Sequence, residues 1–260
     1  MQVNSGCISR IWQINYIQRL MKKLEIACHS LTSALAAQEG GADRIELCMA
    51  LTTGGLTPGP GLLELVKEKI NIPVHILIRP RIGDFAYTSL EVDTMVKSIG
   101  LVRKLGFAGV VVGCLTQNHT LDLWNLDRML EAAGELDVTF HRAFDFIEDK
   151  SQALEDLIER GVSRVLTSGG AASAHGGAAV LMSLIEQAAG RIVVMPGAGI
   201  NAQNLPQIIE QTKATEYHAS AKKVIPQTHS TSEFKLTEVE SHRYETDVEE
   251  VGRLKDVLNG

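Results

Sequence analysis

The chain has 260 residues, of which 45% are hydrophobic and 22% are charged, and its formal net charge is −6. This composition is typical of a folded globular protein and excludes a disordered chain. The negative charge, with no cluster of Lys and Arg, excludes a broad nucleic-acid surface, and the sequence has no run of about 18 apolar residues to cross a membrane.

Residues 1–20 open the chain and lack the continuous apolar run of a secretory signal. Met21 begins a more regular start, MKKLEIACHS. We therefore expect residues 1–20 to be a loosely held extension upstream of the native start, and residues 21–260 to form the folded domain. The four cysteines are widely spaced and form no C-x-x-C pair, which is typical of a reduced, cytoplasmic protein.

Eight short β-type runs follow in series, and they begin at residues 24, 44, 74, 109, 138, 164, 191 and 216. Amphipathic helical patterns separate them. Gly41, Gly106 and Gly161 each follow a helical pattern and precede a strand, as expected at the C-terminal ends of helices. Eight such units without a linker between them predict one closed (β/α)8 barrel, a TIM barrel, rather than an open doubly wound sheet.

The segment after the last predicted strand, residues 224–245, is polar and weakly periodic, and it is longer than an ordinary loop. We expect it to lie over the mouth of the barrel. Residues 247–260 then predict a closing helix, because acidic residues stand in its first turn and Lys255 stands near its end.

Alternation along each predicted strand indicates which side chains enter the barrel. Neighbouring residues of a strand point to opposite faces, and the more apolar set is the one that packs on the helices. The inward set is then polar near the carboxyl ends of the strands: Glu25, Ala27, His29, Glu46, Cys48, His75, Leu77, Arg79, Arg81, Thr139, His141, His218 and Ser220. Barrel enzymes place their chemistry at these ends. Two interpretations stay open, a ligand site and a structural lattice of buried ion pairs.

Small residues follow the last three predicted strands, in TSGG (167–170), PGAG (196–199) and HASA (218–221). Backbone N–H groups can approach an anion closely at such positions, and barrels often hold phosphate after strands seven and eight. The pattern predicts an anion site with four candidate residues: Gly169, Gly197, Gly199 and Ser220. Lys222 or Lys223 is a candidate to add positive charge there.

Six segments together resemble the CutC family, the so-called copper homeostasis proteins: GGADRIELC, GGLTP, IRPRIGDFAY, VTFHRAFD, RVLTSGG and IVVMPGAGI. The resemblance runs from residue 22 to the HASA segment and more loosely to the end of the chain. It implies a cytoplasmic TIM-barrel protein that forms a homo-oligomer and is assigned to copper homeostasis and copper(I) binding.

The resemblance also implies cysteine ligands for copper on the first two predicted strands. Cys48 matches the position on the second strand, whereas the position on the first strand falls at Ala27, one residue before Cys28. Cu(I) prefers thiolate and thioether ligands, so Cys48 and Cys28 are the candidate ligands. Alternation nevertheless turns Cys28 toward the helices, where we expect it to act as a small buried hydrophobe.

Two functional hypotheses remain. The first is a copper-binding or copper-tolerance protein. The second is a TIM-barrel enzyme of lyase or isomerase type that acts on a small anionic, for example phosphorylated, metabolite. In that enzyme Arg79 and Arg142 neutralise developing charge, and His141 or Glu46 moves a proton. Asp145 orients Arg142 or His141. We expect the ligand to be a copper ion or a small anion, and expect neither a nucleic acid nor a membrane as a partner.

Overall fold

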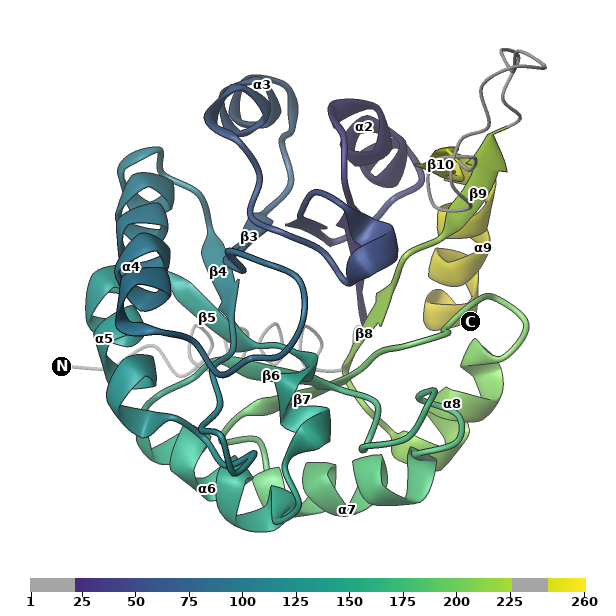
Figure 1. The fold of residues 1–260 in the computed structure, drawn as a ribbon. Coiled ribbons are helices and arrows are strands. Elements are labelled where there is room, and N and C mark those ends of the chain that lie inside the picture. Colours follow the sequence, from purple (N-terminus) through teal and green to yellow (C-terminus); the bar gives the residue numbers. More distant parts are fainter. Residues whose placement is uncertain (1–21, 226–242) are drawn as a thin grey trace, which may run out of the picture.

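The computed structural model describes residues 22–225 and 243–260, and its eight parallel strands form one barrel-shaped sheet. The hydrogen-bonded order is β7-β6-β5-β4-β3-β2-β1-β8, and contacts between β7 and β8 bring the two edges together. The strands are β1 (Lys23–Cys28), β2 (Arg44–Leu47), β3 (Val74–Leu77), β4 (Gly109–Val112), β5 (Asp137–Phe140), β6 (Arg164–Thr167), β7 (Val193–Pro196) and β8 (Glu216–Ala219). Figure 1 shows the helices as an outer ring around them. The prediction of a (β/α)8 barrel is confirmed.

The helices alternate with the strands: α2 (Leu31–Glu39), α3 (Pro60–Lys69), α4 (Ser89–Lys104), α5 (Leu123–Ala133), α6 (Lys150–Glu159), α7 (Ala178–Ala188), α8 (Leu205–Thr212) and α9 (Val248–Asn259). In α4, Thr88 and Glu91 form a capping box at the start, and the buried residues recur at helical spacing: Val92, Met95, Ile99 and Val102. Short 3-10 helices, Leu51–Thr53 and Arg142–Phe146, follow β2 and β5. No helix in the described part of the chain is both long enough and apolar enough to span a bilayer.

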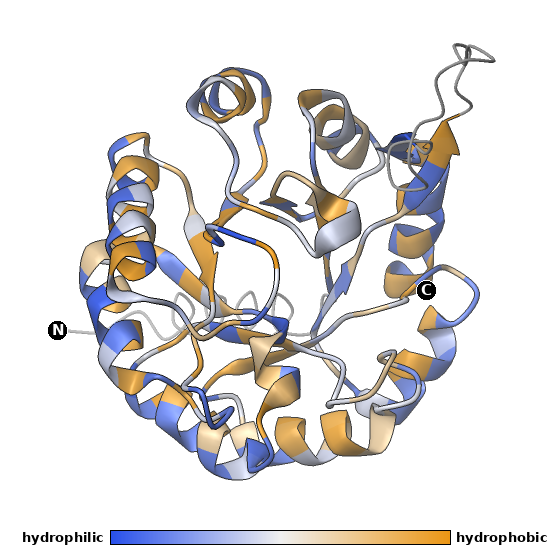
Figure 2. Cartoon of the chain, in the orientation of Figure 1, coloured by the Kyte–Doolittle hydropathy of each residue, from blue (hydrophilic) through white to orange (hydrophobic). Residues whose placement is uncertain are grey.

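The main apolar core lies between the sheet and the helices. Outward-facing strand residues such as Ile26, Ile45 and Phe140 are fully buried in it. In Figure 2 the helices carry both orange and blue residues, as expected for elements with one buried and one exposed face. The strand residues of the other parity therefore point into the barrel.

Buried ion pairs fill the half of the barrel nearest the amino ends of the strands. Arg44 Nε lies 2.5 Å from Glu25 Oε2, and Arg44 Nη2 lies 2.7 Å from Glu216 Oε2. Arg164 Nε lies 3.2 Å from the same Glu216 oxygen, and Arg164 Nη1 lies 3.4 Å from Asp137. Four of these five residues are at most 7% exposed. The structural lattice, one of the two interpretations of the polar interior, therefore holds for this half.

A two-stranded antiparallel ladder follows the barrel, formed by β9 (Lys222–Ile225) and β10 (Arg243–Thr246). Strand β10 packs against α2, and α9 then closes the ring as predicted. Most of the segment that we expected over the barrel mouth lies outside the described residues, as does the extension of residues 1–20.

Candidate functional site

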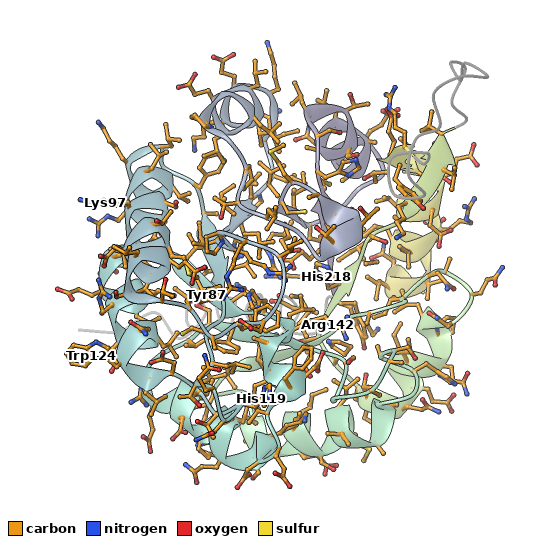
Figure 3. All side chains as sticks on the ribbon, in the orientation of Figure 1. Tyr87, Lys97, His119, Trp124, Arg142 and His218 are labelled. Atoms are coloured by element: carbon orange, nitrogen blue, oxygen red, sulfur yellow. The ribbon has the colours of Figure 1, made fainter. Side chains whose placement is uncertain are left out.

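A cavity of about 400 Å³ opens at the carboxyl ends of the strands. Part of its lining is apolar and includes Ala27, Cys48, Leu77 and Leu166. The polar part holds all four candidate catalytic residues together with two residues at the end of β8: Glu46, Arg79, His141, Arg142, His218 and Ser220. Figure 3 shows Arg142 and His218 inside the ring of helices, whereas Trp124 lies on its outside. We refer to this cavity as the mouth pocket.

Arg79 differs from the other guanidinium groups inside the barrel because no carboxylate of the described residues pairs with it. Its side chain donates instead to three loop carbonyl oxygens at 2.8–3.1 Å, those of Thr53, Gly55 and Gly83. Arg79 is only 6% exposed, and its Nε has no hydrogen-bond partner among the described residues. A buried charge normally needs a counter-charge, so an anion bound beside Arg79 would neutralise its buried positive charge.

His141 is held as a neutral hydrogen-bond donor. Its Nδ1 accepts the N–H of Ala143 at 3.1 Å, which leaves the proton on Nε2, a buried atom with no hydrogen-bond partner in the described part of the chain. Burial, reinforced by Arg79, lowers the pKa of His141 to about 3. The ring lies against Gly113, where a Cβ atom would fall 2.3 Å from the nearest ring atom. The centroid of the His141 ring lies 4.9 Å from that of Phe85. His141 is therefore suited to donate to an oxygen atom, and it is poorly suited to take up a proton at neutral pH.

Glu46, His218 and Glu25 form a buried chain that joins the mouth pocket to the ion pairs. His218 Nδ1 lies 2.8 Å from Glu25 Oε1, and His218 Nε2 lies 3.8 Å from Glu46 Oε2. Burial raises the pKa of Glu46 to about 7. Burial alone would lower the pKa of His218, but Glu46 and Glu25 raise it above its usual value. Glu46 is thus the pocket residue best matched to proton transfer near neutral pH.

Arg142 reaches the mouth pocket from the 3-10 helix after β5, and its side chain is 45% exposed. Its Nε lies 2.8 Å from Asp145 Oδ2, and its Nη2 donates to Ser168 Oγ at 3.2 Å. Asp145 also accepts the N–H groups of Ser168 and Gly170 at 2.9 and 3.1 Å. Of the two residues that Asp145 was expected to orient, Arg142 is the one that it contacts. The N–H groups of the loop after β6 already bind the Asp145 carboxylate.

Two of the four candidate anion-binding residues, Gly199 and Ser220, line the mouth pocket. Within the described residues neither backbone N–H is used in a hydrogen bond. Gly169 and Gly197 do not line the pocket: the N–H of Gly169 goes to Thr167 Oγ1, and that of Gly197 goes to the carbonyl of Thr167. Of the four candidates, only the two at the ends of β7 and β8 remain available for an anion in the mouth pocket. The N–H groups of the other two are used in hydrogen bonds to Thr167.

Three basic residues expected near the site point elsewhere. Arg81 lies outside the barrel, with Nε 2.5 Å from Glu91 and its guanidinium over Tyr87. It follows Pro80 in a loop, where strand alternation no longer applies. Lys223 lies 3.2 Å from Asp247, and Lys222 lies over the ring of Tyr244, so both lysines serve the β9–β10 ladder.

The cysteines do not form a site that fits a resident copper ion. Cys28 Sγ faces the helices, 3.4 Å from the carbonyl of Ser33, whereas Cys48 faces the mouth pocket and packs against Leu77 and Val111. Burial raises the pKa of both thiols, that of Cys28 to about 12, which disfavours the thiolate that binds Cu(I). The described residues contain no group of three or more His, Cys, Asp and Glu side chains placed to hold a metal.

These features define a class of protein: a (β/α)8 barrel with a polar pocket at the carboxyl ends of its strands and an ion-paired interior at their amino ends. A sequence profile of the CutC family matches residues 22–223, and the chain belongs to this family. A CutC family protein of Xanthomonas axonopodis pv. citri is 45% identical over 90% of this chain and 98% of its own length. A crystal structure described as the putative copper homeostasis protein CutC from Streptococcus agalactiae aligns with a TM-score of 0.73 and 30% identity, over 76% of this chain and 98% of that one.

A phosphoribosylanthranilate isomerase from Thermotoga maritima aligns with a TM-score of 0.56 at 11% identity, and covers 92% of this chain. This more distant likeness supports the barrel fold alone.

Proposed function

We propose that the mouth pocket binds a small anionic, for example phosphorylated, metabolite and that the protein catalyses a proton transfer on it, as a lyase or an isomerase does. The observation that carries the proposal is Arg79, a buried cation whose partners in the described structure are neutral carbonyl groups. Arg44 and Arg164 show the contrast, because both pair with Glu216 in the same barrel. An anionic group of a ligand would pair with Arg79 as Glu216 pairs with Arg44 and Arg164.

The hydrogen bonding, protonation and charge of the other pocket residues indicate the role of each. Gly199 and Ser220 offer free N–H groups to a phosphate at the ends of β7 and β8. Arg79 and the Nε2–H of His141 stabilise an oxygen that gains negative charge. Glu46, with a pKa of about 7, takes or gives the proton. Arg142 adds positive charge at the rim of the pocket.

Replacing Arg79 with methionine is expected to weaken the binding of inorganic phosphate at least about tenfold, because a charge-assisted contact contributes about 1.5–3 kcal/mol. Isothermal titration calorimetry at constant pH measures the loss. Arg81→Met is the matched control, because Arg81 lies outside the barrel and pairs with Glu91. Because Arg79 also ties two loops together, Arg79→Lys and a circular-dichroism melt separate loss of charge from loss of structure. Unchanged phosphate binding in a folded Arg79→Met protein would rule the site out.

A second candidate function is copper homeostasis, which the description of the Streptococcus agalactiae relative supports. We propose that any Cu(I) bound directly involves Cys48, the cysteine that faces the pocket. If the unchanged protein binds Cu(I) in an anaerobic titration against a strong chelator, that binding is expected to be lost in Cys48→Ala and kept in Cys28→Ala, because Cys28 faces the helices. Binding no tighter than background in the unchanged protein would contradict a direct role.

We further propose that the protein is a cytoplasmic homo-oligomer, as its family relation implies. Leu90 on α4 and Trp124 on the neighbouring α5 support an interface, because they are 76% and 77% exposed although both are large and apolar. Light scattering coupled to size exclusion measures the oligomeric state, and a monomer at micromolar concentration would contradict the proposal.

A further inference from the structure

We propose that the ligand of the mouth pocket carries a flat apolar group, such as an aromatic ring, and that this group binds in a second cavity beside Phe146. The inference rests on the proposed anion site and narrows its substrate class to an anion joined to a planar apolar moiety. Three features support it: the second cavity, the series of rings at its edge and the charges of its wall.

The second cavity has a volume of about 460 Å³ and lies between the loops that follow β3, β4 and β5. It shares Gly83, Phe85 and Phe146 with the mouth pocket, so the two cavities adjoin at these residues. Leu115 and Ala86 add apolar wall, and His119 also lines the cavity. A single molecule can therefore occupy both cavities with its two ends.

A series of rings leads from the polar site to this cavity. The ring of Phe85 lies 4.9 Å from that of His141 and 5.7 Å from that of Phe146, and both pairs are tilted. The guanidinium carbon of Arg79 lies 5.1 Å from the same Phe85 ring. Phe85 thus contacts both Arg79 and Phe146, and a small molecule can bridge the distance between them.

Phe146 is unusual for an aromatic residue because it is 60% exposed, although Phe144 in the same short helix is fully buried. An exposed ring at the edge of a cavity gains free energy when a second flat apolar group covers it, and tilted or offset contacts of this kind are favourable. Phe144 is therefore part of the core, whereas the ring of Phe146 is available to a ligand at the edge of the second cavity.

The charges around the second cavity favour an uncharged group there. Its one carboxylate, Asp84, lies 3.0 Å from Arg81 and is already paired. The hydroxyl of Thr116 is bonded to that of Thr120 at 2.8 Å. No Lys or Arg lines this cavity in the described structure, so a second anionic group would find no permanently charged side chain to pair with. The anion belongs beside Arg79, and the apolar group belongs beside Phe146.

Matched phosphate esters test the inference. Methyl phosphate carries the anion alone, whereas phenyl phosphate and 3-phenylpropyl phosphate add a ring on a short and a longer connection. At least one ring-bearing ester is expected to bind about five- to tenfold more tightly than methyl phosphate, as aromatic contacts of this strength allow. Phe146→Ala is expected to remove most of this gain and to leave methyl phosphate binding unchanged. Leu65→Ala is the control, because it removes a large apolar side chain, 47% exposed on α3, that lines neither cavity.

The outcomes separate this inference from the anion site on which it rests. If methyl phosphate binds and the rings add nothing, or if Phe146→Ala keeps the full gain, the second cavity has no such role while the anion site stands. If none of the three esters binds, the anion site itself fails and the inference fails with it. A melting curve for Phe146→Ala checks that the variant is folded, which its exposed position favours.

Discussion

Replacing Arg44 with methionine is expected to lower the free energy of unfolding by about 3–5 kcal/mol, the cost typical of removing one partner from a buried ion pair. Arg44 lies between Glu25 and Glu216, and all three side chains are nearly inaccessible to solvent. Its loss would leave Glu25 with His218 as its remaining charged partner and Glu216 with Arg164. Both carboxylates would then be buried with less compensating positive charge, and the cost of their desolvation would oppose folding.

Chemical denaturation measures the loss of stability, and Arg191→Met is the matched control. Arg191 pairs with Glu155 at 2.7 Å, but its side chain is 47% exposed, so its loss is expected to cost less than about 1 kcal/mol. Equal and small effects of the two substitutions would show that the interior lattice does not stabilise the fold.

Raising the pH from 6 to 8 is expected to weaken anion binding in the mouth pocket by about tenfold or more, because one new unit charge nearby is worth at least about 1.4 kcal/mol at short range. Glu46, with a pKa of about 7, becomes negative over this interval and repels the ligand. His218, whose pKa is raised by Glu46 and Glu25 against the effect of burial, keeps its positive charge to higher pH than an ordinary histidine. Sulfate is the suitable probe, because its own charge is constant over this range.

Glu46→Gln is expected to flatten the pH dependence of sulfate binding and also to change that of stability. Because burial raises the folded pKa of Glu46 above its usual value of 4.5, its favourable contribution is complete below that value and is lost as the pH rises to about 7. The variant should therefore gain stability relative to the unchanged protein above pH 7 and show little difference near pH 4. A pH profile that is identical in both proteins would contradict the assignment of Glu46.

Strand alternation is sufficient to predict much of this site from the sequence. Because side chains on a strand alternate with a period of two, the amino-acid pattern alone assigns Glu46, Arg79 and His141 to the interior. The same alternation, continued toward the amino ends of β2 and β6, also identifies Arg44 and Arg164, which were not among the predicted inward residues. The direction in which Cys28 and Cys48 face follows from the same rule.

The loops could not be predicted in this way, because no periodicity governs them. Asp145 binds the loop after β6 from 23 residues away, and this contact takes Gly169 out of the candidate anion site. Phe85 and Phe146 come from different loops, so their pairing requires the folded barrel. The protonation of His141 depends on one backbone contact to Ala143, which strand patterning does not reveal.

The ion pairs that fill the half of the barrel nearest the amino ends of the strands also determine how a ligand can enter and leave. Side chains of Arg44, Glu25, Glu216 and Arg164 occupy the axis below the mouth pocket, so a ligand that enters through the mouth must leave by the same route. Entry of a second molecule then waits for departure of the first. The loops that carry Gly55, Gly83 and Phe146 surround this single passage, so any ligand of the mouth pocket passes between them both on entry and on exit.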